Sequence, residues 1–254
     1  MEINEDENSL PLMLSIIVPA YNEESFLSKT LLYLNNALSK CPKITKSEII
    51  VVDNASTDDT AKIATNFGAR VIFEPDRKIS KARNRGAESS IGDYLLFVDA
   101  DTFACEKIIQ QAFDLLSSDH AYGGGALIKF DDHQNKFFLG KLIPSFWNWI
   151  STTFGYAAGG FLYCTREDFQ KVNGFPETMY AGEELGLVRK LKKLNRKSPK
   201  KFKIITNPPV ITSSRKLSWY GNTQIILYLL LLFFFPLAVR FQKLCGFWYN
   251  RPHQ

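Results

Sequence analysis

The 254-residue sequence predicts an α/β protein with a mostly parallel sheet flanked by helices. Two observations support this fold class. Short apolar runs of strand length alternate with segments whose apolar residues recur at helical spacing, and four such repeats follow one another within residues 14–98. The connections between them are short, and such repeats bring strands together in parallel with helices on both faces.

The first predicted strand is Leu14–Val18, a β-branched run bounded by Pro19. A helix follows, because leucines at 27, 31, 34 and 38 recur every three or four residues and form one apolar stripe. The other elements predicted before residue 120 are strands at Glu48–Val52, Ala69–Phe73 and Tyr94–Val98, with helices from about Asp58 to Phe67, at Ile79–Ile91 and near Phe103–Ser117.

The pattern changes after about residue 120. Tyr122–Phe130 is strand-like, and its glycines allow another backbone to approach closely. An aromatic-rich stretch, Phe137–Phe154, precedes a further apolar strand at Gly160–Cys164. Gly182–Asn195 has a helical apolar stripe, and Lys203–Thr206 is predicted as an edge strand ended by Pro208 and Pro209.

Charge is divided unevenly along the chain. The formal net charge is +5, yet all 26 acidic residues lie at or before Glu184, and 14 Lys and Arg follow it. Such asymmetry indicates a polyanionic partner, either nucleic acid or an anionic membrane. The four cysteines are scattered, which argues against a disulfide framework or metal cluster and favours a reducing cytosolic setting. The acidic N-terminus has no pattern typical of a secretory signal.

Four polar clusters follow the predicted strands of the first half. They are Pro19–Glu24, Asp53–Ser56, Asp76–Arg83 and Asp99–Asp101. Ligands of open parallel sheets bind at the carboxyl ends of the strands, so we expect these clusters to share one rim and form a site.

Asp99 and Asp101 come directly after the apolar strand Tyr94–Val98. Two carboxylates beside a low-dielectric interior are costly unless a cation is present. Hard oxygen ligands suit Mg²⁺ or Mn²⁺, held by one or two carboxylates together with substrate phosphates. The alternative is that one of these aspartates only caps the following helix.

Five segments of the sequence resemble the family 2 glycosyltransferases of GT-A fold. They are SIIVPAYNEE (15–24), IIVVDNASTDDT (49–60), KARNRGAESSIGDYLLFVDADT (81–102), GGFLYCTREDFQKVNGFPE (159–177) and GEELGLVRKL (182–191). The resemblance covers roughly residues 13–195, and the first three segments recur in the family's order and spacing. It implies a Rossmann-like GT-A sheet, a nucleotide-diphosphate sugar donor and a divalent metal.

By this resemblance, Asp53 accepts a hydrogen bond from the base, usually uracil, and Arg83 reaches the nucleotide. Asp99 contacts the ribose or the water shell of the metal, and Asp101 ligates the metal. The donor-binding set that the resemblance implies is Pro19, Ala20, Tyr21, Asn22, Glu23, Asp53, Asn54, Arg83, Asp99, Ala100 and Asp101. For Arg83, a solvated helix position is the alternative.

The resemblance also places the acid/base residue in Gly182-Glu183-Glu184. The family commonly has Glu-Asp there, with the second member acting as base on the acceptor hydroxyl, so Glu184 takes that role and Glu183 is the second candidate. Alternatively, both glutamates only favour the positive N-terminus of their helix. Arg215 is expected to neutralise the departing diphosphate, or else belongs to a basic pair at a membrane surface.

These features together predict the transfer of a single sugar and not polymerisation, since the Gln-x-x-Arg-Trp motif of processive synthases is absent. We expect inversion, a UDP-linked donor and a lipid-linked or membrane-proximal glycan acceptor. Three alternatives were considered: a non-catalytic sugar-nucleotide or lipid-binding relative, a sugar-phosphate nucleotidylyltransferase, and a nucleic-acid-binding protein. The second lacks its glycine- and arginine-rich loop here, and the third lacks any recognised motif.

The predicted organisation is a flexible N-terminus at 1–12, a glycosyltransferase domain at 13–216 and a hydrophobic segment at 217–254. The domain has a nucleotide-binding half at 13–120 and an acceptor half at 121–216. Ile225–Val239 is uncharged and apolar all round. Trp219 and Tyr220 before it, and Trp248 and Tyr249 after it, are predicted to lie at the lipid–water interface. The basic residues before it favour an anionic membrane over nucleic acid. We therefore expect attachment to the cytoplasmic face of a membrane, anchored or half-inserted through about 219–249; a helix buried in a homodimer is the alternative.

Overall fold

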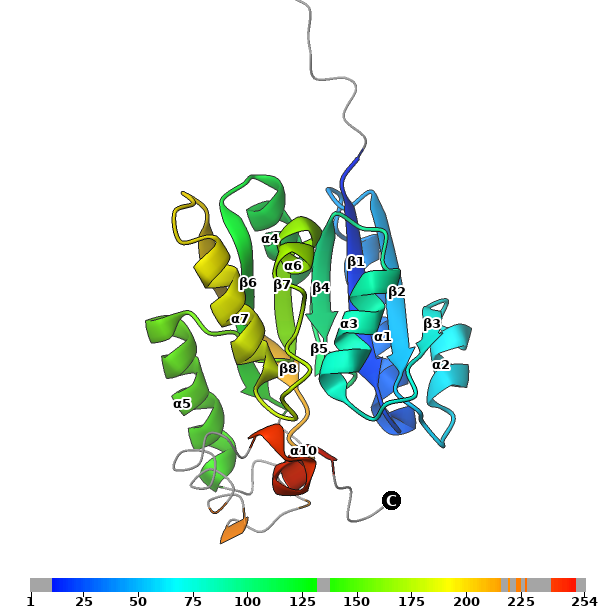
Figure 1. The fold of residues 1–254 in the computed structure, drawn as a ribbon. Helices are drawn as coiled ribbons and strands as arrows, with labels where there is room; N and C mark the ends of the chain where they lie inside the picture. Colours follow the sequence, from blue (N-terminus) through cyan, green and yellow to red (C-terminus); the bar gives the residue numbers. More distant parts are fainter. Residues whose placement is uncertain are drawn as a thin grey trace, which may run out of the picture.

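The computed structural model describes residues 11–131, 138–215 and 239–249, together with Trp219, Thr223, Gln224 and Leu227. Figure 1 shows a central sheet with helices packed on both of its faces. The sheet has eight strands in the order β3-β2-β1-β4-β7-β6-β8-β5. The predicted α/β class is therefore confirmed.

The first half is a run of strand–helix repeats, as predicted. Its elements are β1 (Met13–Ala20), α1 (Glu24–Ser39), β2 (Lys46–Asp53), α2 (Thr60–Asn66), β3 (Arg70–Phe73), α3 (Ile79–Ser89) and β4 (Tyr94–Val98). β1 pairs in parallel with β2 on one side and with β4 on the other, and β2 pairs in parallel with β3. The chain order thus reverses beside β1, which makes the gap between β1 and β4 the switch point of the sheet.

The second half extends the sheet beyond β4. Its elements are β5 (Thr102–Phe103), α4 (Glu106–Ser117), β6 (Ala121–Phe130), α5 (Phe138–Phe154), β7 (Phe161–Thr165), α6 (Arg166–Lys171), α7 (Glu183–Leu194) and β8 (Lys201–Thr212). β7 is antiparallel to both β4 and β6, whereas β6 and β8 are parallel. The aromatic-rich stretch forms α5, and β5 and α6 were not predicted.

The prediction of a short edge strand at Lys203–Thr206 is wrong. β8 runs for 12 residues and lies between β6 and β5, with Pro208 and Pro209 inside it. The ladder to β6 shifts register at this point, since Ala126 faces Ile205 whereas Ile128 faces Val210. Prolines cannot donate to a ladder, and the register shift places them in the unpaired part of the strand.

Alternating residues of the strands divide the core between the two faces of the sheet. Ile16 and Val18 of β1 pack with α1 and α4, while Ile17 packs on the other face with α3 and α7. The same alternation continues in β4, where Leu96 and Leu95 belong to opposite clusters. Both faces of the central strands are covered, so β4 is apolar and buried throughout, and β1 and β2 are buried along most of their length up to the loops that follow them.

The predicted membrane attachment is corrected by the structure. In the part of the chain that it describes, no helix is both long and apolar enough to cross a bilayer. The apolar run Ile225–Val239 lies outside the described residues, apart from Leu227 and Val239. Val239 accepts a hydrogen bond from the backbone N–H of Tyr180 at 2.6 Å. It precedes η3 (Gln242–Cys245) and α10 (Gly246–Tyr249).

The aromatic residues beside the apolar run explain why the sequence was misleading. Trp219 and Tyr249 were predicted to lie at a lipid–water interface, but both line a pocket of the domain. The Tyr249 ring also packs edge-on against Tyr180, with ring centroids 5.7 Å apart. A pocket offers an aromatic ring the same partial burial as a membrane interface, so the sequence pattern cannot distinguish the two.

Candidate active site

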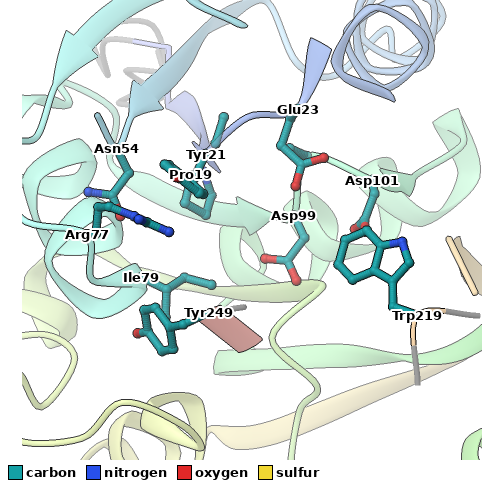
Figure 2. Close-up of a pocket in the computed structure, with 12 residues that line it drawn as sticks. Pro19, Tyr21, Glu23, Asn54, Arg77, Ile79, Asp99, Asp101, Trp219 and Tyr249 are labelled. Carbon is teal, nitrogen blue, oxygen red and sulfur yellow. The ribbon is translucent and has the colours of Figure 1, made fainter. Parts of the chain in front are cut away.

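The site lies at the carboxyl ends of the parallel strands, beside the switch point between β1 and β4. Figure 2 shows the pocket there, with side chains converging from several loops. Its lining is Pro19, Ala20, Tyr21, Glu23, Asn54, Arg77, Ile79, Asp99, Ala100, Asp101, Trp219 and Tyr249. The four polar clusters that follow the strands thus meet at one rim, each contributing to the lining or to the contacts behind it.

The loops after β1 and β2 hold each other by hydrogen bonds. The Asn22 backbone N–H donates to Ser56 Oγ at 3.0 Å, and Asn22 Oδ1 accepts from the Thr57 N–H at 2.8 Å. Asn22 adopts a φ of 50°, a left-handed conformation that asparagine tolerates better than most residues. Asp53 is buried and accepts from the Ser56 N–H at 3.0 Å. Asn22 and Asp53 therefore shape the loops behind the pocket and are not among its lining residues.

In contrast to Asn22 and Asp53, three other side chains line the pocket itself: Tyr21, Asn54 and Arg77. The Arg77 guanidinium lies 3.9 Å from the centre of the Tyr21 ring. Asn54 is fixed by its side-chain amide, which donates to the carbonyls of Glu74 and Asp76 at 3.1 and 2.5 Å. This end of the pocket combines an aromatic face, an amide and a cation, a set that suits a nucleoside and its phosphates.

Arg83 connects the first aspartate of the Asp99-Ala100-Asp101 motif to the helix α7. It is only 2% exposed and donates to Asp99 Oδ1 at 2.7 Å and to Glu183 Oε1 at 2.6 Å. It also donates to the Gly159 carbonyl at 3.1 Å. Burial opposes its charge, but Asp99 and Glu183 outweigh burial and raise the pKa of Arg83. Arg83 is thus a buried bridge between two parts of the site, not a solvated helix residue.

Arg215 connects the second aspartate to the loop after β1. Its guanidinium donates to both carboxylate oxygens of Glu23, at 2.6 and 2.5 Å, and to Asp101 Oδ2 at 3.1 Å. All three side chains are about nine-tenths buried. Burial disfavours the guanidinium charge, yet the carboxylates of Asp101 and Glu23 reverse this and raise the pKa of Arg215.

Glu184 differs from its neighbour Glu183, which is ion-paired with Arg83. Burial is the largest effect on Glu184, followed by the negative charge of Glu183, and together they raise its pKa to about 8. Arg83 acts in the opposite direction but does not cancel them. A carboxyl group with a pKa near neutral pH is suited to take a proton from an acceptor hydroxyl.

The site contains more carboxylates than basic groups, which suits the binding of a divalent cation. The ion-pair network contains Glu23, Asp99, Asp101 and Glu183, balanced by the two guanidinium groups of Arg83 and Arg215. These arginines engage one oxygen of Asp99 and one of Asp101. Among the described residues no group of three or more acidic, His or Cys side chains is placed to hold a metal. A cation here would therefore need phosphate oxygens of the substrate as further ligands.

Eight of the predicted donor-binding residues line the pocket, namely Pro19, Ala20, Tyr21, Glu23, Asn54, Asp99, Ala100 and Asp101. Arg77, Ile79, Trp219 and Tyr249 also line it and were missed. Arg77 and Ile79 lie in the polar cluster after β3 and could have been included on that basis. Trp219 and Tyr249 carried no such signal, because they come from the segment that was interpreted as membrane-bound.

The fold and the pocket define a nucleotide-binding α/β domain of GT-A type. The family model of glycosyl transferase family 2 matches residues 15–175, more than half of the chain. The chain therefore belongs to glycosyl transferase family 2.

Two curated relatives illustrate the similarity. An uncharacterized glycosyltransferase of Haemophilus influenzae is 29% identical over 138 residues, covering 50% of this chain and 52% of that protein. A dolichyl-phosphate beta-glucosyltransferase of Dictyostelium discoideum is 36% identical over 110 residues, covering 37% of this chain and 33% of that protein. The matches thus span about half or less of the curated relatives.

Solved structures of the same fold extend further along the chain. Staphylococcus aureus TarS 1–349 in complex with UDP-GlcNAc superposes with a TM-score of 0.63 at 19% identity, covering 90% of this chain and 66% of that one. The mannosyltransferase PcManGT from Pyrobaculum calidifontis, in complex with GDP-Man and Mn²⁺, gives 0.61 at 17% identity, covering 92% and 64%. At these identities the likeness establishes the fold.

Proposed function

We propose that this chain transfers a single sugar from a nucleotide-diphosphate sugar to an acceptor hydroxyl, with inversion and a divalent metal. The observation that carries the proposal is that the donor pocket and the candidate base are connected by a buried arginine. Asp99 lines the donor pocket, and Arg83 ties it directly to Glu183, next to the candidate base Glu184. A donor and a base are thereby held at one rim of the sheet.

The donor is proposed to lie along the pocket, with its nucleoside near Tyr21, Asn54 and Arg77 and its diphosphate near Asp99 and Asp101. The complexes of TarS with UDP-GlcNAc and of PcManGT with GDP-Man support the proposal that the donor is a nucleotide sugar. We favour a UDP-linked donor from the sequence resemblance. Bound Mg²⁺ or Mn²⁺ would be held by Asp101 and Asp99 and would neutralise charge on the diphosphate.

The residues of the chain supply the remaining chemistry. Glu184 takes the proton of the acceptor hydroxyl, whose oxygen attacks the anomeric carbon as the bond to the diphosphate breaks on the opposite face. One displacement of this kind inverts the anomeric configuration. Arg83 holds the first turn of α7 in place through Glu183, and Glu184 in the same turn lies near enough to Arg83 and Asp99 for their charges to affect its pKa.

The acceptor is proposed to be a glycan or a lipid-linked acceptor. The support comes from relatives, whose names include a poly(ribitol-phosphate) beta-N-acetylglucosaminyltransferase and a dolichyl-phosphate beta-glucosyltransferase. The membrane attachment predicted from the sequence does not support this acceptor, because no helix among the described residues could cross a bilayer.

A thermal-shift screen tests the donor. UDP-, GDP- and dTDP-sugars are compared in Mn²⁺ and in EDTA, and a ligand present at 100 times its Kd should add about 2.7 kcal/mol to the free energy of unfolding. We expect a metal-dependent shift with UDP-sugars, followed by sugar transfer to glycan or lipid-linked acceptors. The absence of a shift with every nucleotide sugar would contradict the proposed function.

A further inference from the structure

The lining of the pocket changes character along its length. Figure 2 shows Asn54 and Arg77 at one end, Asp99 in the middle, and the Trp219 indole beside Asp101 at the other end. With the nucleoside at the first end and the diphosphate at the aspartates, the part of the donor that follows is the sugar. Trp219 therefore lies where the transferred sugar would be.

Trp219 is held in relation to the aspartates through Arg215. The Arg215 guanidinium lies 5.5 Å from the centre of the indole ring, and the same guanidinium is bound to Glu23 and Asp101. Phe26 contacts this guanidinium as well, at 4.4 Å from its ring centre. A buried cation that is fixed by two carboxylates gives the indole a defined place at the end of the pocket.

The indole face can contact some parts of the donor favourably and others not. The face of the ring carries partial negative charge, so it attracts cations and C–H groups but not phosphate oxygens. A pyranose ring presents a face of C–H groups that can pack on an aromatic ring. A nucleobase could also stack on an indole, but the nucleoside is proposed at the other end of the pocket, beside Asn54 and Arg77. The sugar is thus the part of a nucleotide sugar that Trp219 can recognise at its own end.

We propose that Trp219 is a sugar-recognition residue, whose indole packs against the pyranose of the bound donor. The inference rests on the proposed function and adds a specificity residue to it. Trp219 lies outside residues 15–175, which the family model matches. The recognition of the sugar is thereby assigned to a part of the chain that the shared motifs do not include.

Calorimetric titration with UDP, UDP-glucose and UDP-GlcNAc in Mn²⁺ tests the proposal, because UDP lacks only the sugar. Trp219→Ala should weaken binding of the UDP-sugar that wild type prefers by about tenfold, while UDP binding changes by less than about twofold. Trp219→Leu keeps an apolar side chain without the aromatic face and should show the same selective loss. Trp219→Phe should retain most of the affinity.

Trp149→Ala is the matched control, because Trp149 on α5 is 56% exposed and does not line the pocket. It should change neither affinity. Equal losses for UDP and UDP-sugar in the folded Trp219 variants would overturn the proposal and assign Trp219 to the nucleotide. Unchanged affinities would overturn it as well. A wild-type protein that binds neither UDP nor the UDP-sugars contradicts the proposed function itself, a result distinct from a loss confined to the Trp219 variants.

Discussion

At the scale of single residues, the two buried arginines determine what the carboxylates around them can do. Arg83 binds Asp99 and Glu183, and Arg215 binds Glu23 and Asp101, so each of these four carboxylates has a guanidinium group beside it in a partly buried site. Among the described residues Glu184 forms no ion pair, and burial and the charge of Glu183 raise its pKa instead. The site thus separates four carboxylates that are paired with guanidinium groups from one carboxyl group whose pKa is raised.

The first prediction concerns Asp101. Asp101→Asn keeps the size of the side chain but removes its charge, so turnover should be abolished and the thermal shift by UDP in Mn²⁺ should shrink strongly. Asp99→Asn should be comparably damaging. Asp119→Asn is the control, because Asp119 is exposed and pairs only with Lys200 among the ion pairs described. Full activity of the Asp101 variant in EDTA would contradict the metal-dependent mechanism.

The second prediction concerns Glu184 and pH. Only the deprotonated carboxylate accepts a proton, so kcat/KM should rise with pH until about 8 and level off above it. Glu184→Gln should lower kcat by roughly 10²–10⁴ and remove this rise while donor binding persists. A pH–rate profile of both proteins measures the effect. A wild-type profile that is flat between about pH 6 and 9 would exclude Glu184 as the base.

The same shift in pKa has a consequence for stability. A carboxyl whose pKa is raised in the folded chain binds a proton more tightly than in the unfolded chain. Its contribution to stability is complete below the unfolded pKa of 4.5 and is lost as pH rises toward about 8. The free energy of unfolding of Glu184→Gln should therefore fall less than that of wild type as pH rises from 4.5 to about 8. Glu183→Gln should be less stable than wild type, because Arg83 loses a charged partner.

At the scale of elements, β6 depends on glycine where β7 and β8 pack against it. A Cβ on Gly124 would lie 1.9 Å from the Lys203 carbonyl oxygen and 2.3 Å from the Tyr163 hydroxyl. That hydroxyl donates to the same carbonyl at 2.8 Å, so neither atom can move aside without breaking this hydrogen bond. The glycines that suggested close approach in the sequence are therefore required by the pairing of three strands.

The third prediction follows from this contact. Gly124→Ala should lower the free energy of unfolding by more than about 3 kcal/mol, because the strands must separate to admit a methyl group. Gly68→Ala provides the comparison, since Gly68 has a φ of 75° but nothing within 4 Å of an added Cβ. Its cost should be about 1 kcal/mol. Chemical denaturation measures both, and equal costs would contradict the packing argument.

α5 shows why part of the second half was harder to predict. Phe146 and Trp149 stack on its exposed side with ring centroids 5.9 Å apart, so its aromatic residues do not mark a buried face. The helix is tied to the sheet by Asn148, whose side chain bonds both the N–H and the carbonyl of Ile128, at 3.0 and 2.8 Å. A single polar contact between distant segments leaves no periodic signal in the sequence.

At the scale of the whole molecule, the ion pairs of the site join distant parts of the chain. Arg83 and Glu183 are 100 residues apart, and Arg215 and Glu23 are 192 apart. The fourth prediction is that Arg215→Gln lowers the free energy of unfolding by about 3–5 kcal/mol, because it removes the guanidinium charge that is bound to two largely buried carboxylates. Mn²⁺ should restore part of the loss.

Thermal unfolding with and without Mn²⁺ measures this effect. Lys43→Gln is the control, because Lys43 forms an exposed ion pair with Asp114 and such pairs contribute little. An Arg215 variant that is as stable as wild type would show that the carboxylates Glu23 and Asp101 are compensated by water or relax apart.

Sequence reasoning succeeded where a local pattern corresponds to a local structure. The strand–helix repeats, the polar clusters at strand ends and Asp99-Ala100-Asp101 are all short-range signals, and the structure brings them to one rim. The partners of Arg83 and Arg215 are set by tertiary packing, which no spacing reveals. The prediction of a membrane segment was wrong because its aromatic flanks are equally typical of a pocket and of a membrane interface. Only tertiary packing distinguishes these two environments.

The distance in sequence between Glu23 and Arg215 also sets an order of events during synthesis. Within the part of the chain that the structure describes, the residues of the two hydrophobic clusters precede Arg215, and the last of them in the first cluster is Val210. A ribosome adds about 5–20 residues per second, so roughly 10 to 40 s separate Glu23 from its arginine. The nascent chain therefore contains both of these clusters before it contains the arginine that pairs with Glu23, so this ion pair of the pocket can form only after most of the sheet has been synthesised.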